Sequence, residues 1–178
     1  MPSHVAFLRG MNLGGRRITN PDLCAAVEEL GFTDVAAFLA SGNVAFTGKG
    51  TPAALQKRIE AGLEKSLGYA VPTFIRSAAQ VRAVAEGDPF AARAVKGSRG
   101  KPQVVFLAKK PTTKAKAAAL ALETDDDWLA IEGQELHWWP IGGLSTSEFD
   151  FKALSKIVGE PTVRTKNTNV RLATKYFS

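Results

Sequence analysis

The chain has 178 residues, of which 45% are hydrophobic and 22% are charged. This composition is typical of a soluble globular protein that needs no metal or disulfide to fold. No apolar run approaches the roughly 20 residues of a membrane span, and the first residues lack the basic leader and apolar core of a secretory signal. We therefore expect a cytoplasmic protein that does not bind membranes, and the single cysteine, Cys24, agrees with a reducing compartment.

The basic residues of the chain, which has a net charge of +6, are unevenly distributed. Three stretches are basic and contain no carboxylate: residues 1–21, 89–122 and 161–178. If these stretches lie near one another, they form a positive face that attracts anions. If they point in different directions, they are ordinary solvated segments. The sequence leaves both interpretations open.

The first half of the chain shows the pattern strand–helix–strand–strand–helix–strand. Short apolar runs predict strands at residues 4–9, 34–40, 44–48 and 71–76. Two helices are predicted from their cap residues, Asn20 and Thr51, each followed by a proline, and from the glycines past their ends, Gly31 and Gly68. A capping box formed by Ser77 and Gln80 predicts a third helix that continues to about Glu86.

The second half largely repeats this order after a basic, glycine-containing segment at residues 96–102. Strands are predicted at residues 103–108, 128–132, 135–139 and 161–164, with a two-residue hairpin turn between the middle two. Helices are predicted at residues 114–122, from Ser147 to Gly159, and at the C-terminus, with Asn167 as the cap.

The repeated order predicts an α+β fold built from two ferredoxin-like βαββαβ units in tandem. We expect antiparallel or mixed sheets with the helices on one face. The predicted domains are residues 1–88 for the first unit and its extra helix, 89–102 for a basic linker, and 103–178 for the second unit and the C-terminal helix.

The segment "RGMNLGGRRITNPDL" (residues 9–23) follows the first predicted strand and combines arginines with three glycines. In a βαββαβ unit, the loop after the first strand lies at the same sheet end as the hairpin between the second and third strands. This topology brings seven residues together: Arg9, Asn12, Gly14, Gly15, Ser41, Gly42 and Asn43. Glycines allow backbone N–H groups to form an anion-binding nest, but they also make tight turns that bind nothing. The glycine spacing matches neither the dinucleotide-binding motif nor the P-loop.

The C-terminal residues 162–175 combine threonines, asparagines and basic residues without any acid. If this segment folds over the loop, Arg164 and Asn167 join the candidate binding site. Asn167 and its polar neighbours are also favourable helix caps, which is the purely structural interpretation.

We interpret most of the other residues with reactive or metal-binding side chains as structural. Two histidines and one cysteine without metal-ligand spacing predict no metal site, and we expect no cofactor. Residues 125–127 are three aspartates that we interpret as a solvated turn. We interpret Cys24 as a small core residue, and His137 as a surface or packing residue and not as a general base. Of the adjacent Trp138 and Trp139, one is expected in the core and the other on the opposite face, where it can stack a base.

Three motifs, "RGMNLGG", "SGNVAF" and "TVRTKNT", together resemble a widespread bacterial family known as domain of unknown function 1697. The last motif of that family usually reads arginine, asparagine, tryptophan, asparagine, threonine. Arg164, Asn167 and Thr168 match this pattern, whereas Thr165 and Lys166 depart from it. The resemblance implies a cytoplasmic protein with a duplicated α/β fold, and it carries over no established activity, cofactor or catalytic residue.

Three classes of function follow from these observations. The first is an anion-binding module that binds nucleic acid or a phosphorylated small molecule through the basic glycine loop. The second is a protein-interaction or structural domain without catalysis. The third is a small enzyme acting on a phosphorylated or carboxylated substrate, which is the least favoured because the sequence has no catalytic constellation.

Overall fold

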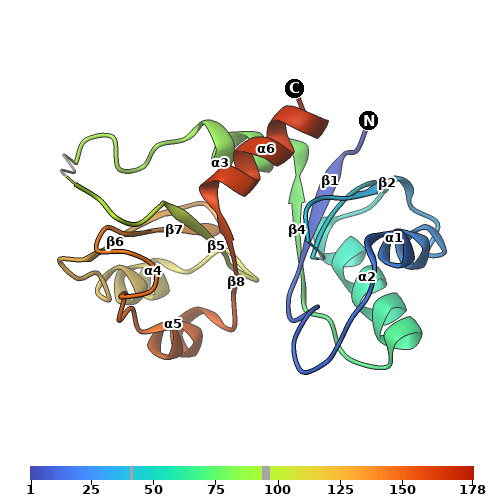
Figure 1. Cartoon of the computed structure of the whole chain (residues 1–178), viewed down its shortest axis with the longest axis horizontal. Coiled ribbons are helices and arrows are strands. Elements are labelled where there is room, and N and C mark those ends of the chain that lie inside the picture. The colour runs from blue at the N-terminus through green and yellow to red at the C-terminus, as the bar shows by residue number, and fades with distance from the viewer. Residues whose placement is uncertain (41, 94–96) are drawn as a thin grey trace. The chain divides into compact units, whose positions relative to one another are not determined.

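The computed structural model of the chain describes residues 1–40, 42–93 and 97–178 (Figure 1). The chain divides into two compact units. The first consists of Met1–Ala85 together with Val170–Ser178, and the second consists of Glu86–Asn169. None of the helices in the described ranges combines the length and the apolar composition that crossing a membrane requires.

The first unit contains a four-stranded antiparallel sheet in the order β2-β3-β1-β4. Its strands are β1 (His4–Leu8), β2 (Thr33–Ala37), β3 (Asn43–Thr47) and β4 (Thr73–Ser77). Its helices are α1 (Asn20–Glu28), α2 (Pro52–Leu67) and α3 (Ala78–Glu86), whose last residue is counted with the second unit. Figure 1 shows α1 and α2 side by side along one face of this sheet.

The main core of the first unit lies between that sheet face and the two helices. Alternate strand residues point toward the helices because successive side chains of a strand face opposite sides. The strands contribute Ala6, Leu8, Val44, Phe46 and Ile75, and the helices contribute Leu23, Val27, Leu55, Ile59 and Leu63. This core fixes β1 and β3 as the central strands, and the loops at their ends therefore start from rigid positions.

The second unit contains a four-stranded antiparallel sheet in the order β6-β7-β5-β8. Its strands are β5 (Gln103–Phe106), β6 (Asp127–Glu132), β7 (Glu135–Pro140) and β8 (Thr162–Thr165). Its helices are α4 (Thr113–Leu120) and α5 (Phe151–Val158). The last helix, α6 (Lys166–Tyr176), begins in the second unit and ends in the first. The α+β class and the antiparallel sheets agree with the sequence-based expectation, whereas no described strand pairing is parallel.

Several local predictions are confirmed because their signals are short-range. Thr51 Oγ1 accepts the Ala54 N–H (3.2 Å) at the start of α2, and Gly68 ends the helix at φ 79°. The capping box is present, with Ser77 Oγ accepting the Gln80 N–H and Gln80 Oε1 accepting the Ser77 N–H. The hairpin between β6 and β7 turns at Gly133, which adopts φ 59°.

Three predicted helix starts are wrong. Thr19, and not Asn20, caps α1. Asp150, and not Ser147, caps α5. The first turn of α6 is closed by Thr165 Oγ1, which accepts the Thr168 N–H, and not by Asn167. In each case a second residue of cap type stands close by, and which of the two becomes the cap depends on where the preceding segment ends.

The two compact units differ from the predicted domains in where they assign the C-terminal segment. The predicted second domain, residues 103–178, includes the whole of α6, whereas Val170–Ser178 belong with the first unit. Several contacts hold this segment there: the rings of Phe38 and Tyr176 pack edge-to-face at 6.0 Å, the Lys175 ammonium lies over the Phe38 ring, and Arg82 donates a hydrogen bond to the Phe177 carbonyl oxygen.

Candidate functional site

Three connections of the first unit meet at one end of its sheet. The loop after β1 is tied to the β2–β3 connection by the Leu8 N–H, which donates to the Gly42 carbonyl at 2.7 Å. It is tied to the start of β4 by the Arg9 N–H, which donates to the Pro72 carbonyl at 3.0 Å. The side chain of Asn20 adds a third link, because its Nδ2 donates to the Leu39 carbonyl at 2.7 Å. The neighbourhood expected from the topology is therefore present for Arg9 and Gly42.

The loop between β1 and α1 is open to solvent along its glycine-rich part. Gly14 and Gly15 adopt φ values of 58° and 81°, and no heavy atom would lie within 4 Å of a methyl group placed on either residue. Asn12 is exposed beside them, whereas Met11 is buried in the core and anchors the loop. A left-handed backbone pair with nothing packed on it can direct N–H groups toward an anion.

The start of α1 contributes less to this loop than a free helix N-terminus would. Asp22 lies in the first turn, where its side chain accepts the Thr19 hydroxyl at 2.6 Å and its N–H donates to the same hydroxyl. A carboxylate in this position already complements the positive end of the helix. The glycines and arginines are therefore the remaining groups of this loop that can attract an anion.

Arg16 is positioned by contacts that the sequence analysis did not identify. Its guanidinium lies 4.1 Å above the centre of the Tyr69 ring, in the range of a cation–π contact. A methyl group placed on Gly10 would lie 3.8 Å from Arg16 Nη1, so the side chain folds back over the start of its own loop. The Arg16 N–H also donates to the Leu13 carbonyl, which closes a turn around Gly14 and Gly15.

The hairpin residues of the predicted site have mainly structural partners. Asn43 is buried and its Nδ2 donates to the Phe38 carbonyl, while the Phe38 N–H donates to the Asn43 carbonyl. These bonds close the connection between β2 and β3. Gly42 is also buried, and its backbone adopts φ 121°. Ser41, the third predicted hairpin residue, lies outside the described residues.

Arg164 and Asn167 belong to the second unit. Arg164 Nη1 donates to Thr162 Oγ1 (2.8 Å) and to the Val163 carbonyl (2.9 Å), and burial lowers the pKa of its guanidinium to about 10. Asn167 is exposed in the first turn of α6. Their participation in the loop site stays a prediction.

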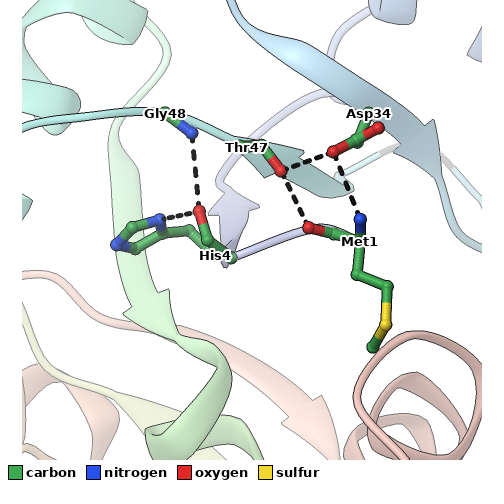
Figure 2. Close-up of polar contacts among 6 residues, drawn as sticks. Met1, His4, Asp34, Thr47 and Gly48 are labelled. Atoms are coloured by element: carbon green, nitrogen blue, oxygen red, sulfur yellow. Dashed lines mark hydrogen bonds and ion pairs between the residues drawn. The ribbon is translucent and has the colours of Figure 1, made fainter.

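A separate polar cluster lies at the N-terminal end of β1 (Figure 2). Ser3 Oγ and His4 Nδ1 are 2.7 Å apart, and the Gly48 N–H donates to the same hydroxyl at 3.4 Å. Burial lowers the pKa of His4, whose ring also stacks on Phe46. The Ser3 hydroxyl and the His4 imidazole are thus within hydrogen-bond distance of each other.

The same figure shows a second group centred on Asp34. Thr47 Oγ1 donates to Asp34 Oδ2 at 2.8 Å, and the Met1 ammonium lies 3.4 Å from that oxygen. These bonds, first from Thr47 and then from the ammonium, lower the pKa of Asp34. Asp34 adopts φ 50°, an unusual conformation for a residue other than glycine.

An acidic pocket of about 720 Å³ opens in the second unit. Its lining residues are Arg99, Thr124, Asp125, Asp126, Asp127, Gly142, Gly143, Thr146, Ser147 and Glu148. The interpretation of all three aspartates as a solvated turn is wrong for Asp127, which is only 2% exposed. Asp127 accepts hydrogen bonds from Trp138 Nε1 and Ser147 Oγ, which explains its burial and the displacement of Ser147 from the predicted cap position. No group of three or more potential metal ligands occurs among the described residues.

The two tryptophans of β7 face opposite sides as expected. Trp138 is buried with Phe149 and Phe151 in the core of the second unit. Trp139 is half-buried on the other side, where it packs against Phe90 and its Nε1 donates to Ser98 Oγ. Because these contacts surround its ring, packing is its evident role.

The remaining candidates also have packing environments. His137 is buried, and burial lowers its pKa more than the Glu132 carboxylate raises it, with Lys166 lowering it further. Cys24 is half-buried on α1, next to the core residue Leu23. Both agree with the structural interpretations.

Comparison with known proteins identifies the family. A family model described as "Protein of unknown function (DUF1697)" matches residues 1–137. The chain belongs to this family. No curated protein matches the chain.

A solved structure of a conserved bacterial protein from Streptococcus pneumoniae is similar to this DUF1697 chain. The TM-score is 0.72 with 18% sequence identity, and the alignment covers 98% of this chain and 97% of that one. At this identity the similarity concerns the fold alone.

Proposed function

We propose that this DUF1697 protein is a cytoplasmic anion-binding module, and that the loop of residues 9–17 binds the phosphate groups of a nucleic acid or of a phosphorylated small molecule. The observation that carries the proposal is the open pair Gly14 and Gly15 at positive φ, flanked by arginines. Residues 1–21 contain three arginines and no carboxylate, so every charged side chain that this stretch presents to an anion is positive.

The anchoring of the loop supports the same proposal. Hydrogen bonds from Leu8, Arg9 and Asn20 hold both neighbouring connections against the loop. A site whose backbone is already positioned loses little conformational entropy when a ligand binds. Asn12 and Arg17 are exposed at this end of the sheet and are the polar side chains best placed to add contacts to the backbone N–H groups.

A titration tests the proposal directly. Fluorescently labelled oligonucleotides and nucleotides are titrated with the full chain at low salt, and the titration is repeated at rising salt concentration. We expect binding whose affinity falls with salt, because phosphate contacts release counterions. Arg17→Glu should weaken binding and lower the magnitude of the salt slope by about one.

Lys57→Glu is the matched control, because it makes the same charge change at an exposed position of α2. The control should bind as the unmodified chain does. No binding of either ligand class at low salt, or binding that does not depend on salt, would contradict the proposal.

We further infer that the two units are copies of one ferredoxin-like βαββαβ plan. The corresponding strand orders, β2-β3-β1-β4 and β6-β7-β5-β8, support this inference. The strand register supports it as well, because Val5 pairs with Arg76 in the first unit and Val104 pairs with Arg164 in the second. Each arginine immediately precedes the residue whose hydroxyl caps the following helix, Ser77 or Thr165.

A second candidate function, a protein-interaction domain, is favoured by one observation. Leu13 and Leu39 are 66% and 40% exposed on two of the connections that meet at this sheet end. Exposed apolar side chains that gather at one place favour a protein contact. Sedimentation at micromolar concentration tests self-association, and a strict monomer without a copurifying partner would count against this candidate.

A further inference from the structure

We propose that the ligand of the loop is single-stranded nucleic acid, and that one of its bases stacks on the outer face of the Arg16 guanidinium. This inference rests on the proposed phosphate-binding function and names its ligand class. It is carried by the stack of Arg16 on Tyr69, which stands directly beside the open glycine pair.

Tyr69, on which Arg16 stacks, is itself held in place by the residues around it. Tyr69 follows the left-handed Gly68 that ends α2, and it is half-buried against the main core of the first unit. One side of Arg16 is therefore occupied by the Tyr69 ring at 4.1 Å, and Gly10 lies close to Nη1. Arg16 as a whole remains exposed.

A planar guanidinium held in this way has two chemical uses. Its charge attracts phosphate, and its flat face stacks on the π-face of a base in the way that an aromatic side chain does. An isolated, freely rotating arginine provides the charge but has no fixed face. Arg16 is thus suited to a ligand that carries bases as well as phosphates.

The openness of the loop favours a polymer over a small metabolite. Small-molecule sites enclose most of their ligand, whereas Asn12, Gly14, Gly15 and Arg17 are all exposed. Single strands are bound in open basic grooves, where backbone phosphates and stacked bases contribute together. Arg16 and Arg17 would contact neighbouring parts of one strand.

The test separates bases from phosphates. A fluorescein-labelled DNA single strand of about 12 nucleotides, a length within the range of known sites, is compared with an abasic strand of equal length and charge. Anisotropy titration of the full chain should give about 10-fold tighter binding of the base-bearing strand, which corresponds to one stacked base. Arg16→Lys should remove that preference and leave binding of the abasic strand unchanged, because lysine keeps the charge without a planar face.

Arg58→Lys, on α2 and outside the loop, is the matched control, because the Arg58 guanidinium also lies over an aromatic ring, that of Phe32, and this variant should keep the preference for bases. Equal binding of the two strands by the unmodified chain would overturn the stacking inference and leave the proposed phosphate-binding function standing. Retention of the preference by Arg16→Lys would also overturn it. Competition by adenosine monophosphate at the same nucleotide concentration would instead identify a free nucleotide as the ligand. Binding of neither strand would overturn nucleic acid as the ligand, and binding of neither strand nor adenosine monophosphate would overturn the proposed function itself.

Discussion

At the scale of single residues, Thr19 and Asn20 show how neighbours of similar chemistry take different roles. Both residue types are strong helix caps, and the sequence pattern alone favours Asn20. In the structure Thr19 Oγ1 accepts the Asp22 N–H, and Asn20 is released to bind the Leu39 carbonyl 19 positions along the chain. The prediction failed because a long-range acceptor competes for the asparagine, and no local pattern reports such an acceptor.

Thr19→Ala should lower the free energy of unfolding by about 1 kcal/mol, because the Asp22 N–H loses its cap. Urea denaturation measures the change, and Thr51→Ala, which removes the corresponding cap of α2, provides a matched comparison of similar size. A Thr19→Ala chain as stable as the unmodified one would show that Asn20 takes over the cap.

The contact between Arg16 and Tyr69 is the part of the candidate site that the sequence analysis did not predict. The glycine loop and its neighbour at Gly42 were predicted because the strand order follows from the element order. The partner of Arg16, Tyr69, lies 53 positions away in sequence and belongs to no motif. The same topological argument also places the α2–β4 connection at this sheet end, and applying it there would have included Tyr69 among the candidates.

At the scale of elements, β6 shows how an edge strand is protected. β6 ends the sheet order, so one of its sides pairs with none of the described strands. Glu123 Oε2 accepts the Leu129 N–H at 2.8 Å, and Arg93 Nη1 lies 2.8 Å from the same oxygen while its guanidinium covers the Trp128 ring. A charged side chain on the edge hinders pairing with another chain.

This arrangement predicts a pH dependence. Desolvation raises the pKa of Glu123, but the hydrogen bonds from Arg93 and Leu129 and the charge of Arg93 together lower it more. A carboxyl group with a lowered folded-state pKa stabilises the fold above its unfolded pKa, and the stabilisation is lost as the pH falls through the folded value. Between about pH 5 and pH 3, the unmodified chain should therefore lose more stability than Glu123→Gln.

Urea midpoints across that pH range measure the effect. Glu28→Gln, at an exposed position of α1, is the matched control and should follow the unmodified chain. Parallel pH profiles for the unmodified chain and Glu123→Gln would contradict the assignment of Glu123 as the group responsible.

The elements themselves were predicted well where their signals are local, and their ends less well. Gly68, the capping box and the Gly133 turn each depend only on residues that are close in sequence. The start of α5 was misplaced because Ser147 donates to the buried Asp127, a partner 20 positions away. Prediction of that helix start requires knowledge of the core before the helix is placed.

At the scale of the whole molecule, the first unit is completed by Val170–Ser178 from the end of the chain. Within this unit Phe177 is buried, and Tyr176 contacts Phe38 just beyond β2. The division of the chain into compact units therefore does not follow its sequence order.

Phe177→Ala should lower the free energy of unfolding by about 3 kcal/mol, the lower end for removal of a buried aromatic ring. Hydrogen exchange should show faster opening of α3, because Arg82 contacts the Phe177 carbonyl. Thr174→Ala serves as the control, because Thr174 is exposed and its hydroxyl donates within α6, to the Val170 carbonyl. Unchanged exchange in α3 would show that the segment does not stabilise the unit.

The same division has a consequence for synthesis on the ribosome. The nascent chain emerges at about 5–20 residues per second, so the segment that completes the first unit follows Ala85 by on the order of 10 seconds. During that interval the residues of the second unit are being added to the chain, while Phe38 still lacks the Tyr176 ring. The first unit is thus translated first but completed last. Until then, its uncovered apolar surface is accessible to chaperones.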